Sequence, residues 1–281
     1  MRIAHLILTH ANSNQLKRLI NSLKHADADF YIHVDLKAAI IDFLSLADIE
    51  NVFFIKRRVR VTWGSYSILQ ATINSYSEIL NSNKKYDYIN LLSAQDYPLK
   101  STEEIHLFFK NNAGKAFMET LSVENVWQEA IPRLTKYHLT DYSFFGKNKV
   151  ENFLNKILPE RKMPNGLIAV GRSQWITITP THAAYIIEYL KKNPNVKRFF
   201  KLTWGSDEIM FQTILFNSQY KDDIVYDNLR FIDWSEGKAS PKTFTIQDLS
   251  TLINSGKLFA RKFNASIDEK VLNELDKHRA K

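Results

Sequence analysis

Apolar positions along the first hundred residues switch between the periods typical of strands and helices. A short apolar run at 2–10 is followed at 12–25 by leucine and isoleucine at helical spacing, and the same succession returns further along. The expected strands are 2–10, 29–35, 51–57 and 86–94, and the expected helices are 12–25 and 65–83, with a short link at 38–47. This alternation predicts an open, largely parallel sheet whose ligand crevice lies at the carboxyl ends of the strands.

The second half of the chain begins less regularly. Residues 115–170, in which Pro and Gly cluster at 155–166, are expected to form an insertion that shapes a second wall of the crevice. Further strands are expected at 172–179 and 228–234, and further helices at 180–193, 203–218 and 245–255. No repeat or linker divides the chain, so we expect one domain over 1–281, with a nucleotide-binding half at about 1–110 and an acceptor and catalytic half at about 111–281.

Composition and charge narrow the class of protein. The 281 residues are 44% hydrophobic, enough for a substantial core, and the net charge of +8 permits an anionic partner such as a nucleotide diphosphate or an anionic membrane. Lys and Arg are scattered, which disfavours nucleic acid. The absence of cysteine excludes disulfides and thiolate sites. The apolar run at 2–10 is too short to span a bilayer, so we expect a cytoplasmic protein, either free or resting on the inner membrane face.

Motif searches exclude several kinds of enzyme. The eight glycines form no Walker or G-x-G-x-x-G pattern, and neither H-E-x-x-H nor G-x-S-x-G occurs. One D-x-D triplet, Asp27-Ala28-Asp29, could chelate a divalent ion, but it precedes a strand, so a solvated turn is the favoured interpretation. A single acid, Asp96, follows the strand at 86–94. The sequence therefore predicts no metal site.

Polar residues at strand ends are the remaining candidates. Asp35 ends the second strand, where it could accept hydrogen bonds from a ribose or simply form a turn, while His33 is expected to pack in the sheet. Gln95 and Asp96 precede Pro98, so at least one of them should face the ligand. Trp63 could wall a nucleotide or sugar, or belong to the core.

Two adjacent acids open the stretch TWGSDEIMFQTILFNS at 203–218. Acids in the first turn of a helix gain roughly 0.3–1 kcal/mol from its dipole, so the pattern alone favours helix punctuation for Asp207 and Glu208. Chemistry for either acid needs a further argument.

Ordered blocks along the chain supply that argument. They are HVDLK at 33–37, VTWGSYSILQA at 61–71, INLLSAQDYPLKS at 89–101, GRSQWITIT at 171–179, GSDEIMFQTILFNS at 205–218, and LRFIDWSEGKASP at 229–241 with GKLFARKF at 256–263. In these blocks the chain resembles the core-2/I-branching β-1,6-N-acetylglucosaminyltransferases and peptide xylosyltransferases of glycosyltransferase family fourteen. Without cysteine, it looks like a bacterial-type soluble member.

The resemblance implies a GT-A type α/β fold, a UDP-sugar donor, inversion at the anomeric carbon and catalysis without a metal or other cofactor. It maps the general base onto Glu208 and the diphosphate cations onto Arg230 and Lys262, with Arg261 as a helper. Displacing a diphosphate needs a base for the acceptor hydroxyl and fixed positive charge for the leaving group, which these residues can supply. The expected donor is UDP-N-acetylglucosamine and the expected product a β-1,6 linkage on a glycan.

Alternatives remain open. A xylosyltransferase would use the same residues, and a non-catalytic nucleotide-sugar or glycan-binding module would keep the fold. A glycoside hydrolase using Glu208 and Asp96 is chemically possible.

The resemblance also implies contacts to the donor and acceptor sugars. Residues 122–133 depart from the family, and the choice of acceptor is expected to lie in this region. Asp207 is expected to stabilise the helix start or orient Glu208. The expected sugar contacts are Gln95, Asp96, Ser173, Gln174, Trp175, Asp207, Glu119, Trp127 and Trp234.

Overall fold

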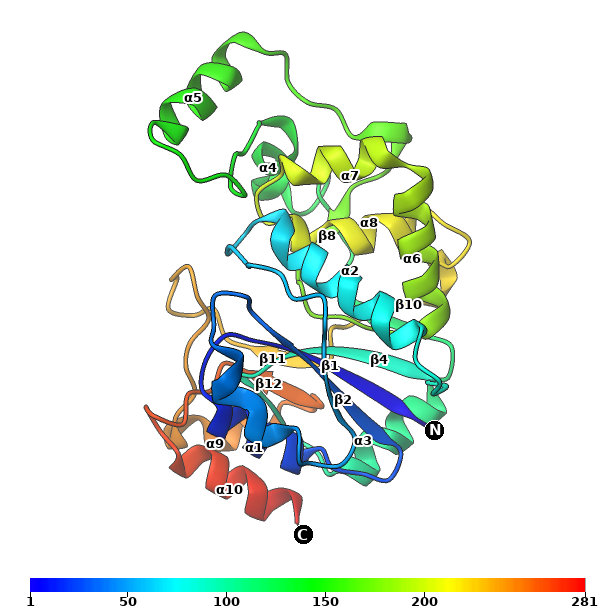
Figure 1. The fold of residues 1–281 in the computed structure, drawn as a ribbon, viewed down its shortest axis with the longest axis vertical. Coiled ribbons are helices and arrows are strands. Elements are labelled where there is room, and N and C mark those ends of the chain that lie inside the picture. The colour runs from blue at the N-terminus through cyan, green and yellow to red at the C-terminus, as the bar shows by residue number, and fades with distance from the viewer. Residues whose placement is uncertain (281) are drawn as a thin grey trace.

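A seven-stranded sheet forms the centre of the computed structural model, which describes residues 1–280 (Figure 1). Its order is β10-β6-β9-β4-β1-β2-β3. The strands are β1 Ile3–Thr9, β2 Ala28–Val34, β3 Val52–Phe54, β4 Tyr88–Ser93, β6 Ala116–Met118, β9 Thr177–Ile178 and β10 Ile224–Tyr226. β1 pairs in parallel with β2 and β4, β2 with β3, and β10 with β6, whereas β9 runs antiparallel between β4 and β6. The predicted α/β class with a mostly parallel sheet is confirmed.

Smaller sheets extend the central one. β5 (Asp96–Pro98) follows β4 almost directly and pairs antiparallel with β12 (Phe259–Arg261), which runs parallel to β11 (Arg230–Ile232). β7 (Leu121–Ser122) pairs with β8 (Val170–Gly171). Pairing of β12 with β5 brings β11 and β12, from the last fifth of the chain, beside the carboxyl end of β4.

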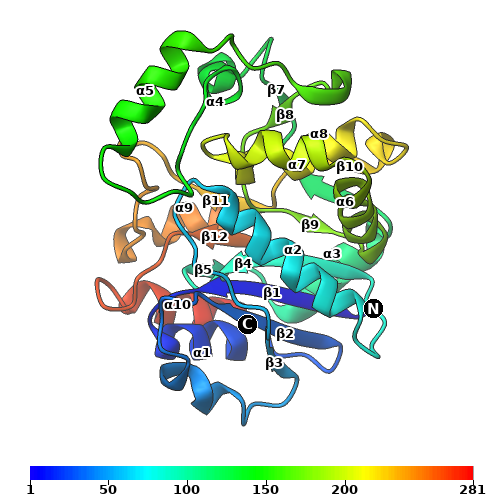
Figure 2. The ribbon, with the colours of Figure 1, turned by 45° about the horizontal axis from the view of Figure 1, so that its top comes forward.

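Helices cover both faces of the central sheet (Figure 2). One face carries α1 Ser13–Ser22, α3 Thr102–Asn111, α9 Leu249–Asn254 and α10 Lys270–Arg279; the other carries α2 Tyr66–Leu80, α6 Pro180–Lys192, α7 Pro194–Lys201 and α8 Met210–Phe216. The period of two along β1 sends Ile3 and Ile7 into the first core and Ala4 and Leu6 into the second. Burial on both faces explains the continuous apolar runs of the parallel strands.

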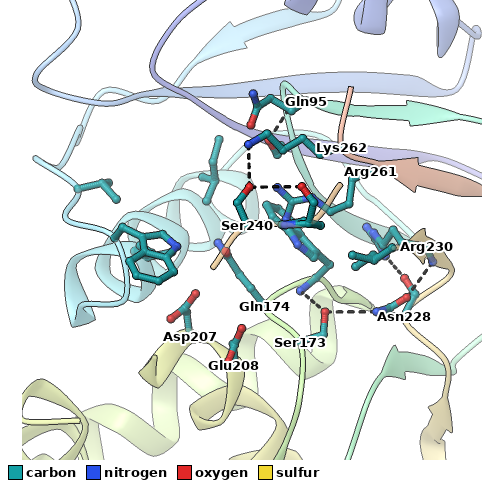
Figure 3. Close-up of a pocket in the computed structure, with 18 of the residues that line it drawn as sticks. Gln95, Ser173, Gln174, Asp207, Glu208, Asn228, Arg230, Ser240, Arg261 and Lys262 are labelled. Carbon is teal, nitrogen blue, oxygen red and sulfur yellow. Dashed lines mark hydrogen bonds between the residues drawn. The ribbon is translucent and has the colours of Figure 1, made fainter. Parts of the chain in front are cut away.

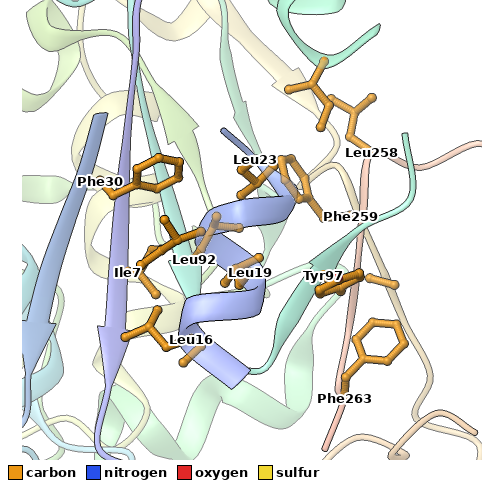
Figure 4. Packing of buried hydrophobic residues seen from close by; sticks show 14 of the residues in the cluster. Ile7, Leu16, Leu19, Leu23, Phe30, Leu92, Tyr97, Leu258, Phe259 and Phe263 are labelled. Atoms are coloured by element: carbon orange, nitrogen blue, oxygen red, sulfur yellow. The ribbon is translucent and has the colours of Figure 1, made fainter. Parts of the chain in front are cut away.

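Packing of α1 follows the spacing seen in the sequence. Asn12 caps the start of the helix: its side-chain Oδ1 accepts a hydrogen bond from the Gln15 backbone amide at 3.0 Å. The apolar residues at helical spacing then lie between the central sheet and the small sheet (Figure 4). The neighbours drawn there are Ile7, Leu16, Leu19, Leu23, Phe30, Leu92, Tyr97, Leu258, Phe259 and Phe263.

Several sequence expectations need correction. The strand expected at 172–179 is reduced to the two residues of β9, and the helix expected at 203–218 is divided into a 3-10 turn, Ser206–Glu208, and α8. Asp29 is not in a solvated turn: it lies fully buried in β2, where Arg2 and Lys84 each approach its carboxylate to 2.7 Å.

The region 115–170 contains short elements and one projecting helix. α4 is Ile131–Thr135 and α5 is Lys147–Ile157. Within residues 1–280, the structure contains no helix that is both long and apolar enough to cross a bilayer.

Candidate active site

A cavity of about 690 Å³ opens at the carboxyl ends of β1, β2 and β4, where the strand and helix succession placed the ligand crevice. His10 follows β1, Asp35 follows β2 and Gln95 follows β4. Most of the predicted site residues line this cavity: His33, Asp35, Trp63, Gln95, Glu119, Ser173, Gln174, Trp175, Asp207, Glu208, Arg230, Trp234, Arg261 and Lys262. Figure 3 shows Asp207 and Glu208 on one wall and Lys262 with Gln95 across the cavity.

Glu208 is held by an arginine from the central region of the chain. Arg133 Nη1 lies 2.5 Å from Glu208 Oε2, and the guanidinium stacks over the ring of Trp204 at 4.2 Å. Nothing in the sequence singled out Arg133, because it lies in the stretch 122–133 that departs from the family. The ion pair leaves Glu208 partly exposed toward the cavity.

Two glycines allow the backbone to bring Glu208 to this place. Gly205 has φ of 64°, and a Cβ there would lie 2.7 Å from Arg133 Nη1. A Cβ on Gly171 would lie 2.1 Å from the Glu208 carbonyl oxygen, which accepts a hydrogen bond from the Arg172 amide at 3.0 Å. The 3-10 turn carrying Glu208 is therefore packed directly against β8.

Asp207 is buried beside Glu208. Burial and the adjacent Glu208 carboxylate raise the pKa of Asp207 to about 7. Its Oδ1 atom has no hydrogen-bond partner, and it makes no capping bond to α8. Asp207 lies in the first turn of the 3-10 helix Ser206–Glu208, as expected for an acid at a helix start, and its side chain also lines the cavity.

Two predicted sugar contacts do not reach the cavity. Asp96 is 1% exposed; it accepts from the Ser93 amide at 3.1 Å and faces Arg261 Nε at 3.2 Å. Trp127 is 4% exposed and lies 4.9 Å beneath the Arg133 guanidinium. The sugar-contact predictions for Asp96 and Trp127 are wrong, because both side chains are buried in the wall, where they support cations.

Arg230 lines the cavity from β11, but its guanidinium donates into the protein interior. Nη2 donates to Asn90 Oδ1 and to the Leu91 carbonyl, each at 2.6 Å, and Nη1 donates to Thr177 Oγ1 at 3.3 Å and to the Asn228 carbonyl. The third guanidinium nitrogen, Nε, has no hydrogen-bond partner. The geometry contradicts a forked contact between Arg230 and a diphosphate, because the fork already joins β4, β9 and β11.

Arg261 and Lys262 leave β12 in the direction of the cavity. The Arg261 guanidinium lies 4.1 Å above the Trp175 ring and beside the buried Asp96 carboxylate. Lys262 Nζ donates to Ser240 Oγ at 2.9 Å and has no carboxylate within ion-pair distance in the described residues. The ammonium of Lys262 therefore keeps its charge uncompensated at the cavity wall.

At the carboxyl end of β2, Asp35 does more than form a turn, because its carboxylate also binds a second loop. Asp35 Oδ1 accepts from the Lys37 amide at 2.8 Å and from the Val61 amide at 3.3 Å, which joins two loops at the rim. Burial lowers the pKa of His33 to about 4, so its imidazole is neutral, and Nε2 accepts from the Val59 amide at 3.0 Å. His33 packs in the sheet, as expected, and Trp63 is an exposed wall residue, not part of the core.

The other end carries a polar network. Asn228 Nδ2 donates to Glu119 Oε1 at 2.9 Å and to Ser173 Oγ at 3.3 Å. Burial raises the pKa of Glu119. Trp234 is half exposed at the rim, where an aromatic face is open to a sugar. Asn228 was not singled out from the sequence, because a strand-leading Asn carries no specific signal.

Metal ligands are not grouped in the described residues: no cluster of three or more His, Asp or Glu side chains is arranged to hold an ion. The cations at the wall are side chains of the protein itself.

Comparison with known proteins bears on the chemistry of this cavity. A family model described as Core-2/I-Branching enzyme matches residues 3–253. Xylosyltransferase 2 of Rattus norvegicus is 28% identical over 99% of this chain and 34% of its own, and the xylosyltransferase of Ciona intestinalis is 26% identical over 98% and 34%. This chain thus spans about a third of the length of these relatives. The crystal structure of apo mouse xyloside xylosyltransferase 1 matches with a TM-score of 0.43 and 11% identity, over 92% of this chain and 97% of that one.

Proposed function

The chain belongs to the Core-2/I-branching enzyme family of glycosyltransferases, and we propose that its cavity transfers a sugar from a UDP-sugar to an acceptor hydroxyl with inversion. The observation that carries the proposal is the arrangement of opposite charges across one cavity. Glu208 faces the cavity from one wall, and the ammonium of Lys262 faces it from the other.

Glu208 is the proposed general base. A carboxylate can take the proton from the acceptor hydroxyl as the bond to the anomeric carbon forms. Arg133 occupies Oε2, which holds the side chain in one orientation and leaves Oε1 for the acceptor. Gly171 and Gly205 fix the backbone on which this carboxylate stands.

Lys262 and Arg261 are the proposed partners of the leaving UDP. Negative charge develops on the diphosphate as the glycosidic bond breaks, and preorganised cations at that point lower the barrier. Lys262 is bonded to a neutral hydroxyl, so its charge is available to the phosphate. Arg230 contributes positive potential from within the wall, since its hydrogen bonds go to the protein. In this proposal the fixed cations do the work that a divalent ion does elsewhere.

Two donor sugars are candidates. UDP-N-acetylglucosamine, with transfer in β-1,6 linkage to a glycan, remains the prediction from sequence. The relatives named xylosyltransferases make UDP-xylose the second candidate. Glu119, Ser173, Gln174, Trp175 and Trp234 are the proposed contacts to the sugars, and Asp35, His33 and Trp63 those to the nucleoside.

Release of UDP from the two donors tests the proposal. Wild type is incubated with UDP-N-acetylglucosamine or UDP-xylose and a panel of glycan and serine-peptide acceptors, in EDTA, and compared with Lys262→Ala. We expect turnover of one donor in wild type and a loss of about 100-fold in Lys262→Ala.

Lys238→Ala is the matched control, because Lys238 is exposed, lies two residues from the Ser240 that contacts Lys262, and pairs with Glu236 at 2.8 Å. It should retain activity. UDP binding by wild type without turnover of either donor would instead favour a non-catalytic binding module, and a strict requirement for manganese would contradict the role given to the fixed cations.

A further inference from the structure

Helix α5 is attached to the protein by its polar side. Asn155 accepts from the Tyr137 amide at 2.7 Å and donates to the Tyr137 carbonyl at 2.8 Å, and Glu151 accepts from the Leu139 amide at 2.7 Å. Glu151 and Asn155 are four residues apart and share one face of the helix. That face is turned toward the 137–139 segment, so the opposite face points outward.

The outward face is apolar. Val150, Phe153 and Ile157 recur at spacings of three and four residues, and each is exposed, Phe153 to 59%. Phe145, just before the helix, is fully exposed. We name these four residues the α5 apolar face. A surface helix normally buries such a stripe, and α5 has no buried residue at all.

Cations border this face. At 100° per residue, Lys149 and Lys156 flank it on the side of Phe153, and Lys147 flanks it on the other side. The acid of the helix, Glu151, is turned toward the protein by its hydrogen bond. The outward half of α5 is therefore both apolar and positively charged.

The segment before α5 is tied to the rim of the cavity. Asp141 Oδ1 accepts from the Ser67 amide at 3.2 Å, at the start of α2 and four residues from Trp63. α5 itself projects beyond the body of the molecule, clear of the central sheet (Figures 1 and 2). Contact through the outward face of α5 therefore involves no residue of the central sheet.

We propose that the α5 apolar face binds the surface of an anionic lipid bilayer. Exposed aromatic and aliphatic side chains enter the boundary between headgroups and acyl chains, and flanking lysines pair with anionic headgroups. The net charge of +8 adds attraction at longer range. The binding site does not depend on the proposed glycosyl transfer, but it brings the cavity to a surface that can present a membrane-bound acceptor.

A second copy of the chain fits this face less well. Symmetric pairing through α5 would bring Lys147, Lys149 and Lys156 of both copies together, and like charges at a dry contact oppose association. An anionic surface removes that repulsion.

Co-sedimentation with vesicles tests the proposal. Vesicles of phosphatidylcholine alone are compared with vesicles of phosphatidylcholine and phosphatidylglycerol, for wild type, the double variant Phe145→Ser with Phe153→Ser, and the double variant Lys149→Glu with Lys156→Glu. We expect wild type to bind the anionic vesicles and each variant to lose at least about tenfold in affinity. Leu107→Ser, at an exposed apolar position on α3, is the matched control and should bind like wild type.

All of these substitutions lie at exposed positions, and circular dichroism verifies the fold of each variant. Two results would overturn the proposal. One is equal sedimentation of wild type and the Phe145→Ser, Phe153→Ser variant. The other is a wild-type dimer in ultracentrifugation that the same variant converts to monomer, because the face would then be an interface between copies. UDP-sugar turnover without a membrane acceptor should be unchanged in every variant, which separates this test from that of the proposed function.

Discussion

Single residues at the cavity wall divide into those that face the ligand and those that hold others in place. Glu208 and Lys262 face it, whereas Arg133 contacts Glu208 and Asp96 contacts Arg261. The sequence blocks contained most of the predicted residues that line the cavity, including Glu208 and Lys262. They did not identify Arg133, and they misplaced Asp96, because burial of a side chain behind a wall leaves no signature in a short motif.

Arg133 is a positioning residue in this account. Arg133→Ala should lower the turnover of the UDP-sugar by about tenfold to 100-fold with little change in UDP affinity, because Glu208 loses its fixed orientation but the diphosphate wall is intact. Steady-state kinetics and calorimetric UDP titration measure the two effects separately. Arg198→Ala, an exposed arginine on α7, should change neither. Equal losses in turnover and in UDP affinity would contradict the assignment.

Arg230 should behave as a structural residue. Arg230→Met removes hydrogen bonds to Asn90, Leu91 and Thr177 in the buried layer behind the cavity, and we expect the free energy of unfolding to fall by about 3 kcal/mol. Urea unfolding measures this. A variant with wild-type stability that no longer binds UDP would show instead that Arg230 is a phosphate ligand.

At the scale of elements, the 3-10 turn and β8 determine where the carboxylate of Glu208, the proposed base, lies in the site. The helix expected at 203–218 is interrupted after Glu208, and the 3-10 turn Ser206–Glu208 lies against β8. Periodicity in the sequence located the long apolar helices and the parallel strands, since burial on both faces of a sheet and on one side of a helix leaves a repeating pattern. It could not locate β9, which is two residues long, or the 3-10 turn, because neither is long enough to show a period.

Gly171 should tolerate no side chain. In Gly171→Ala the new Cβ meets the Glu208 carbonyl oxygen, so β8 and the 3-10 turn must separate. We expect turnover to fall by about 100-fold and thermal stability to decrease. Gly237→Ala is the control: its left-handed φ makes alanine unfavourable, but nothing lies within 4 Å of the added Cβ. Activity of Gly171→Ala equal to that of Gly237→Ala would mean that this contact does not position Glu208.

At the scale of the whole molecule, buried histidines couple the fold to pH. Burial lowers the pKa of His5 to about 3 and the pKa values of His33 and His106 to about 4. In the unfolded chain the same side chains titrate near about 6.5. Their contribution to stability is therefore complete above about pH 6.5 and is lost as the pH falls toward about 4, because over that range these histidines take up protons only in the unfolded chain. The raised pKa of Asp207 acts in the opposite direction, because that carboxyl takes up its proton first in the folded chain.

Thermal unfolding of wild type and His106→Gln, measured from about pH 7 down to about pH 4.5, isolates the histidine contribution, because Asp207 is present in both proteins. The melting temperature of His106→Gln should rise relative to that of wild type as the pH falls, because the variant lacks one histidine that takes up a proton only in the unfolded chain. His10→Gln, at an exposed position, should show no such relative rise. Melting temperatures of wild type and His106→Gln that differ by the same amount at every pH in this interval would contradict the prediction.

Architecture at this largest scale was predicted more fully than the site. The alternation of strand and helix gave the mostly parallel sheet and placed the cavity at the carboxyl ends of β1, β2 and β4. Neither α5 nor its projection was predicted, because residues 115–170 were expected only to form an insertion that shapes a second wall of the crevice. Which face of an amphipathic helix meets the protein depends on tertiary hydrogen bonds, here those of Glu151 and Asn155.

The central claim is that Glu208 removes the proton from the acceptor. The most direct measurement is the rate of UDP release from the preferred donor at saturating acceptor for Glu208→Gln, beside its UDP affinity and melting temperature. The account predicts a loss of at least about 100-fold in rate with unchanged UDP affinity and an intact fold. A folded Glu208→Gln variant that transfers the sugar at the wild-type rate would contradict it.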